Sequence, residues 1–140
     1  MHPPAPAAPH AVLLLRDIAE ADVAALLARF GLELRRVADG APIPGSYWGE
    51  PEAGIIGHVV HARGDTPVHS LLHEACHLVV LPPERRRAVH TDATDSVAEE
   101  DAVCLLQALL GDALPGVGRG RVFADMDAWG YTFRLGSARA

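Results

Sequence analysis

The apolar and polar positions of this chain predict two strands and three helices. Apolar residues alternate with polar ones at 32–37 and form a short run at 55–62, so we expect a strand in each segment. Start and stop signals enclose apolar residues at 17–30, 68–81 and 96–110, and these segments are predicted to be helices. The expected fold is therefore α+β: a compact domain with a small mixed or antiparallel sheet and helices packed on it.

The helix at 68–81 is expected to lie in the core. Thr66 can cap its first turn, Pro67 suits its first position, and Pro82 with Pro83 ends it. Its apolar residues cover most of the circumference, which is typical of a buried helix; they are Val68, Leu71, Leu72, Ala75, Cys76, Leu78, Val79 and Val80.

Three polar residues interrupt this apolar helix with a spacing typical of a zinc site. His73 and His77 lie four positions apart, so both imidazoles share one helix face and can bind a single metal ion. Glu74 follows the first histidine, and its carboxylate can act as general base toward a water on the metal. The alternative is a surface helix that carries two histidines by chance. Because unpaired polar groups in a core cost a few kcal/mol, the apolar surroundings favour a metal.

A third ligand is expected from the helix at 96–110, because a catalytic zinc usually takes three protein ligands and one water. Its predicted apolar face consists of Ala98, Ala102, Val103, Leu105, Leu106, Leu109 and Leu110. Glu99 falls near the middle of that face, whereas Glu100 lies at its edge beside Gln107. Glu99 is therefore the preferred ligand and Glu100 the second choice. The competing role for Glu99 is a capping box with Ser96.

His-Glu-x-x-His followed about twenty residues later by Glu-x-x-Ala resembles the gluzincin class of zinc peptidases, in particular the compact minigluzincin and ImmA/IrrE-like proteins. The resemblance implies a zincin-like fold, one Zn²⁺ held by His73, His77 and Glu99, and Glu74 as the residue that polarises the zinc water. Ala102 matches the alanine of the class. Val103 departs from the Asp or Asn that often follows that alanine.

Four longer stretches resemble an uncharacterised family of proteobacterial proteins that has no assigned substrate; they are residues 42–54, 69–77, 99–107 and 125–131. In zincins, a strand directly before the active-site helix often forms an edge that binds extended peptide by main-chain pairing. The resemblance to zincins therefore suggests that the strand at 55–62 would bind substrate.

Composition agrees with one small domain over residues 11–140, preceded by a Pro/Ala-rich segment at 1–10 that is expected to be disordered. The net charge of −6 leaves no basic footprint for nucleic acid or an anionic membrane. The first residues lack the basic region of a signal peptide, and no apolar run is long enough to span a membrane, so a cytoplasmic location is expected. Cys76 and Cys104 are then reduced, and Cys76 is interpreted as a core residue.

A residue that stabilises the oxyanion is also expected, and Tyr131 is preferred over Arg134, His90 and Tyr47. The sequence as a whole predicts a zinc metallopeptidase acting on a peptide or protein substrate. One alternative is a zinc-stabilised binding or regulatory domain without turnover, and another is a metal-free structural protein.

Overall fold

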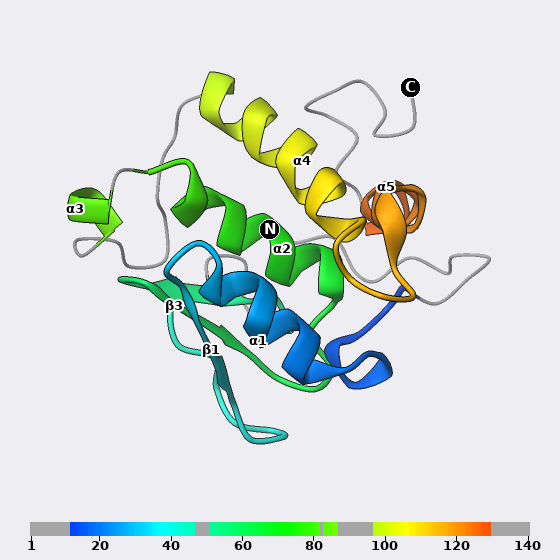
Figure 1. The fold of residues 1–140 in the computed structure, drawn as a ribbon. Coiled ribbons are helices and arrows are strands. Elements are labelled where there is room, and N and C mark those ends of the chain that lie inside the picture. The colour runs from blue at the N-terminus through cyan, green and yellow to red at the C-terminus, as the bar shows by residue number, and fades with distance from the viewer. Residues whose placement is uncertain (1–11, 47–50, 82, 87–96, 130–140) are drawn as a thin grey trace.

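Helix α2 (Val68–Val79) runs through the middle of the fold, between helix α4 on one side and helix α1 with the sheet on the other (Figure 1). The computed structural model describes residues 12–46, 51–81, 83–86 and 97–129. In chain order its elements are η1 (Leu15–Asp17), α1 (Glu20–Ala28), β1 (Glu33–Arg36), β2 (Gly54–Ile56), β3 (Val59–Ala62), α2, α3 (Pro83–Arg86), α4 (Val97–Gly111) and α5 (Gly118–Trp129). The α+β class predicted from the sequence is confirmed.

The sheet has three strands in the order β1-β3-β2. β1 pairs with β3 in parallel, and β2 pairs with β3 in the antiparallel direction, so the sheet is mixed. The strand predicted at 55–62 is in fact two strands, because the chain reverses at Gly57, where φ is +60°. That backbone conformation strongly favours glycine. β3 is consequently the central strand, and β2 is an edge.

One hydrophobic cluster joins a face of the sheet to the helices. Val60 and Ala62 alternate along β3 and lie in the same cluster as Leu71, Leu72 and Leu78 of α2. The cluster also includes residues of α1, α4 and α5: Val23, Leu26, Leu27, Cys104, Ala108, Val122 and Met126. Because α2 is packed on opposite sides by the sheet and α4, its polar residues are held inside the fold.

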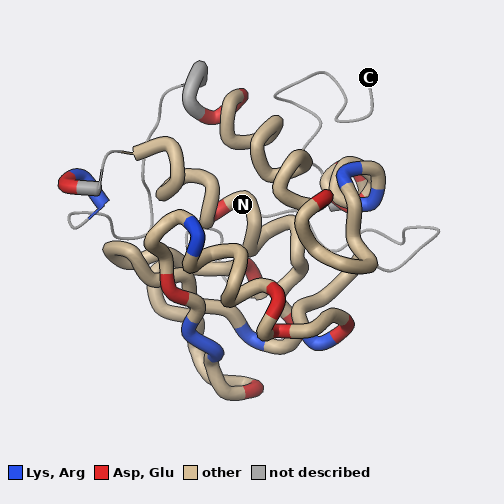
Figure 2. The backbone as a smooth tube through the Cα atoms, viewed as in Figure 1, with Lys and Arg blue, Asp and Glu red and all other residues tan. Residues whose placement is uncertain are grey.

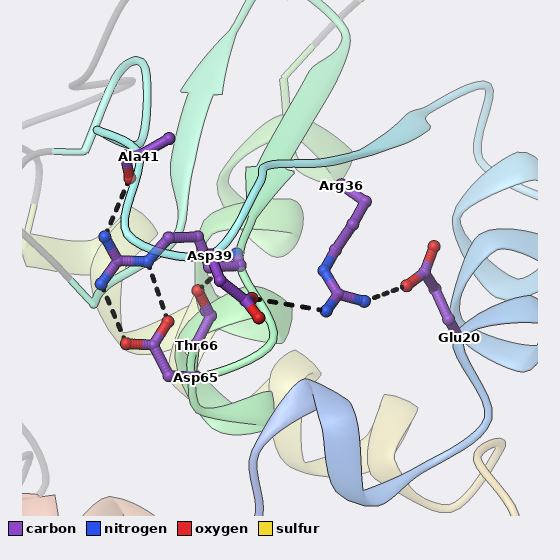
Figure 3. Close-up of polar contacts among 7 residues, drawn as sticks. Glu20, Arg36, Asp39, Ala41, Asp65 and Thr66 are labelled. Carbon is purple, nitrogen blue, oxygen red and sulfur yellow. Dashed lines mark hydrogen bonds and ion pairs between the residues drawn. The ribbon is translucent and has the colours of Figure 1, made fainter.

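A polar network fixes the turn that leads into α2 (Figure 3). The guanidinium of Arg63 donates two hydrogen bonds of 2.9 Å to Asp65 and one of 2.8 Å to the carbonyl of Ala41. Thr66 does not cap α2, because its hydroxyl oxygen accepts the backbone N–H of Arg63 at 2.9 Å; α2 begins after Pro67 without a side-chain cap. The network ties β3, the turn and the segment after β1 together.

The predicted helix at 96–110 is confirmed by α4, which ends at Gly111, but its predicted apolar face is wrong. Val103, Cys104, Gln107 and Ala108 are buried, whereas Leu105 and Leu109 are 52% and 51% exposed. No helix is predicted after Gly111 from the sequence, although α5 forms there and packs against α4. Gly118 and Gly120 in its first turn weaken the helical signal.

Charged residues are interspersed over the described surface, as Figure 2 shows for α1 and β1. In contrast, Glu74 is the only Asp, Glu, Lys or Arg within α2. Within the described part of the chain, no helix is long and apolar enough to cross a membrane. The predicted disorder of residues 1–10 lies outside the described residues.

Candidate metal centre

His73 and His77 lie one helical turn apart on α2, on the side that faces α4. Their ring centroids are 4.9 Å apart and the ring planes are nearly perpendicular, at 83°. The residues are only 5% and 6% exposed. The two imidazoles therefore converge on one buried point, as the spacing of the motif predicts.

Glu100 of α4 supplies the carboxylate that meets both histidines. Its Oε1 lies 2.6 Å from Nε2 of His73, and its Oε2 lies 3.1 Å from Nε2 of His77. One ligand atom from each of the three residues lies within 4.8 Å of the other two, so a single metal ion could contact all three. Two imidazoles and one carboxylate form a donor set that suits Zn²⁺, and the distances make the set compatible with it.

The carboxylate found here belongs to Glu100, the second choice from the sequence, and the expectation that Glu100 lies on a polar edge is wrong. The side chain of Glu99, the preferred ligand, lies outside the described residues. Glu100 falls in register with the buried positions three, four and seven residues later, Val103, Cys104 and Gln107. The helix turns its short and polar residues toward α2 and its large leucines outward. The pair Glu100 and Gln107, seven positions apart, was the available sequence signal for this face.

Gln107 is a buried partner of the site that the sequence motif does not indicate. Its Oε1 lies 2.6 Å from Nδ1 of His73, which donates to it, and its Nε2 donates to the backbone carbonyl of His69 at 2.8 Å. With the amide held by the carbonyl of His69, its oxygen faces the ring and keeps the proton on Nδ1. Nε2 of His73 is then directed toward Glu100 and any bound metal. Gln107 thus provides the contact to the first histidine that Val103 cannot make.

The charges of the cluster compensate one another. Burial raises the pKa of Glu100, but hydrogen bonds from His73 and His77 outweigh burial and hold that pKa well below its usual value. Burial also lowers the pKa of His73, while the neighbouring Cys104 thiol and Glu100 carboxylate raise it, with the net result well above the usual value. Without a metal, the site therefore favours a protonated imidazole beside an ionised carboxylate. A bound cation would replace that proton.

Glu74 is buried, at 6% exposure, on the adjacent side of α2. Burial raises its pKa to about 7, although the nearby charges of His73 and His77 act in the opposite direction. The carboxylate of Glu52, which is also fully buried, contributes to the increase. A carboxyl group that titrates near neutral pH can both accept and return a proton under physiological conditions.

The remaining residues considered are the oxyanion candidates, three further histidines and the two cysteines. Tyr131, Arg134, His90 and Tyr47 lie outside the described residues, so the predicted oxyanion role stays a prediction. His69 is fully buried one turn before His73, whereas His58 is exposed and His61 lies buried on β3. Cys76 and Cys104 are buried free thiols, and Cys76 belongs to the core as predicted.

No protein-family model, curated protein or solved structure matches the chain. The functional interpretation therefore depends on the geometry of the site.

Proposed function

We propose that the protein is a zinc-dependent metallopeptidase in which His73, His77 and Glu100 hold one Zn²⁺ and Glu74 is the general base. The observation that carries this proposal is the convergence of two imidazoles and one carboxylate within 4.8 Å. Three protein ligands are typical of a catalytic zinc, which keeps a further position for water. Placing Glu100 in the role expected of Glu99 leaves the donor set unchanged.

When bound, zinc would lower the pKa of a water molecule to about 7 and polarise the carbonyl of the scissile bond. Glu74 would supply the other half of the reaction. Its carboxylate would take a proton from the attacking water and return that proton to the leaving amine. In the metal-free chain, burial raises the pKa of this group to about 7. Gln107 would orient His73 through the hydrogen bond from Nδ1, and the 6% exposure of Glu74 would limit its contact with bulk water.

A second candidate function is a zinc-stabilised binding or regulatory domain that does not turn over substrate. The burial of the cluster favours it, because His73, His77 and Glu74 are each at most 6% exposed. Structural zinc sites are closed in this way, although they usually have four protein ligands.

The two functions are separated by measuring metal content and hydrolysis on the same preparations. We expect about one zinc per chain and cleavage of an unstructured casein-derived peptide pool. Glu74→Gln should retain zinc, while cleavage should fall on the order of 100-fold or more, because the variant keeps the shape and removes the base.

Glu84→Gln, at an exposed position of α3, is the matched control and should cleave at the wild-type rate. Zinc binding without cleavage would support the binding domain. A chain that binds no zinc would contradict both proposals.

A further inference from the structure

The edge strand β2 has a single outward-facing pair of backbone groups, on Ile55. In an antiparallel pair, each residue directs its N–H and its C=O either both toward the neighbouring strand or both away from it. The N–H of Ile55 donates to the carbonyl of Gly45 at 3.3 Å, so Ile55 faces away from β3. Gly54 and Ile56, its neighbours, face β3 accordingly. Ile55 is therefore the position at which β2 could pair with another extended chain.

That position is already occupied by residues 44–46, which we call the strap. A Cβ atom on Gly45 would lie 2.5 Å from the carbonyl oxygen of Ile55, so the backbone of Gly45 lies against both polar groups of Ile55. Ser46 forms an isolated antiparallel bridge with Gly54, and its hydroxyl donates to the carbonyl of Glu52 at 3.1 Å. The strap thus covers the edge of β2 at Ile55 through Gly45 and at Gly54 through Ser46.

Two glycines make this close approach possible. Gly45 has a φ of +73°, which disfavours other residues, and a Cβ at Gly54 would collide with the carbonyl oxygen of Pro44. Backbone thereby meets backbone without intervening side chains. A positive φ alone does not produce such a close contact. Gly40 has a similar φ of +79°, but no atom lies within 4 Å of its Cβ position.

The covered edge lies beside the candidate metal centre. The N–H of Ala53, directly before β2, donates to the hydroxyl of Ser70 at 3.0 Å. Ser70 lies one helical turn before Glu74 on α2, and the buried carboxylate of Glu52 acts electrostatically on Glu74. A peptide paired with Ile55 would consequently run along the side of α2 that carries the proposed general base.

We propose that the strap is an autoinhibitory segment that holds a peptide-binding edge closed. An extended peptide pairs with Ile55 only after residues 44–46 leave, because the strap accepts the N–H of Ile55 and lies against its C=O. The identification of this peptide as the substrate rests on the proposed function. The competition itself does not, because binding can be measured without cleavage.

The test compares Gly45→Ala with Gly40→Ala. Both variants place an alanine at a positive φ, but only Gly45→Ala forces a Cβ against Ile55. Amide hydrogen exchange at Ile55 should accelerate in Gly45→Ala and stay at the wild-type rate in Gly40→Ala. Peptide binding is measured in a Glu74→Gln background, which prevents cleavage. There, Gly45→Ala should bind the casein-derived peptide pool on the order of 10-fold more tightly, because the peptide no longer has to displace the hydrogen bond between Ile55 and Gly45.

Ser46→Ala provides a milder test if Gly45→Ala does not fold. It removes only the hydroxyl contact to Glu52 and should increase peptide affinity by a few-fold, on the order of half the free energy of one hydrogen bond.

Equal peptide affinity in the strap variants and the Gly40→Ala control, or unchanged exchange at Ile55, would overturn the autoinhibitory role. Tighter binding without cleavage by the Glu74-containing protein would instead preserve the strap and overturn the peptidase proposal.

Discussion

Helices α2 and α4 each contribute to the metal cluster, yet they differ in how much their sequences reveal. α2 carries His73, Glu74 and His77 in one short motif, and the geometry of a single helix brings the two imidazoles together. α4 carries one carboxylate among leucines, and Glu100 reaches the cluster because of the way the helix is rotated against α2. A spacing within one element is a local property. A residue supplied by a second element depends on packing.

The largest effect that tests this difference between α2 and α4 should come from replacing the third ligand. Glu100→Ala should weaken zinc binding on the order of 100-fold to 1,000-fold, beyond the roughly 10–100-fold cost of losing a residue behind a ligand. Glu99→Ala is the matched control on the same helix and should change zinc affinity by less than about 3-fold. Titration with a chromophoric chelator measures both. The reverse order of effects would restore Glu99 as the ligand.

In the metal-free protein, ionisation of Glu74 on α2 and of Glu100 on α4 should change the free energy of unfolding in opposite directions. The pKa of Glu74 is raised from 4.5 to about 7, so its burial penalty is absent below pH 4.5 and develops fully as pH rises through 7. A difference of one pKa unit corresponds to about 1.4 kcal/mol. Glu74→Gln should therefore stabilise the metal-free protein by up to about 3 kcal/mol at pH 8 and change little near pH 4.

Glu100→Gln is the counterpart on α4. The pKa of Glu100 is lowered, so its stabilising charge is present above pH 4.5 and is lost as the pH falls through the lowered value. Denaturant unfolding between pH 4 and pH 8 should show that Glu100→Gln is less stable than the wild type at neutral pH. If Glu74→Gln and Glu100→Gln both stabilised or both destabilised the metal-free protein at neutral pH, this arrangement of charges would be contradicted.

Gln107 tests how strongly α4 controls the orientation of a ligand on α2. Gln107→Leu removes the acceptor for Nδ1 of His73 and should lower zinc affinity by roughly 10–100-fold. Gln107→Glu keeps an acceptor for Nδ1 but loses the donor to the carbonyl of His69, so its affinity should fall between those of Gln107→Leu and the wild type. Equal losses in the two variants would indicate that Gln107 contributes packing alone.

The smallest effects should distinguish the two faces of α4. Val103→Ala creates space at a fully buried position and should cost about 1–3 kcal/mol of unfolding free energy. Leu109→Ala, at a position that is 51% exposed, should change that free energy by no more than about 0.5 kcal/mol. Thermal or chemical unfolding measures both. A larger cost for Leu109→Ala would mean that the leucine face is covered in solution.

Elements with local signals could be predicted from the amino-acid sequence. The helix at α2, its two histidines and the position of Glu74 follow from spacing and from the prolines that end the segment. Gly111 ends α4 as predicted, and the alternation at 32–37 corresponds to β1. Each of these depends on residues that are neighbours along the chain.

Features that depend on contacts between distant segments could not be predicted in this way. Gly57 divides one predicted strand into a hairpin, and β3 becomes a central strand only because β1 pairs with it from elsewhere in the chain. α5 is stabilised by packing on α4 in spite of the glycines in its first turn. The choice of Glu100 follows from the same cause. Burying Val103, Cys104, Gln107 and Ala108 lets α4 approach α2 closely, and that rotation brings the carboxylate to the histidines. The polar pair Glu100 and Gln107 is a weaker local signal than the leucines, and only packing against α2 decides between the two faces.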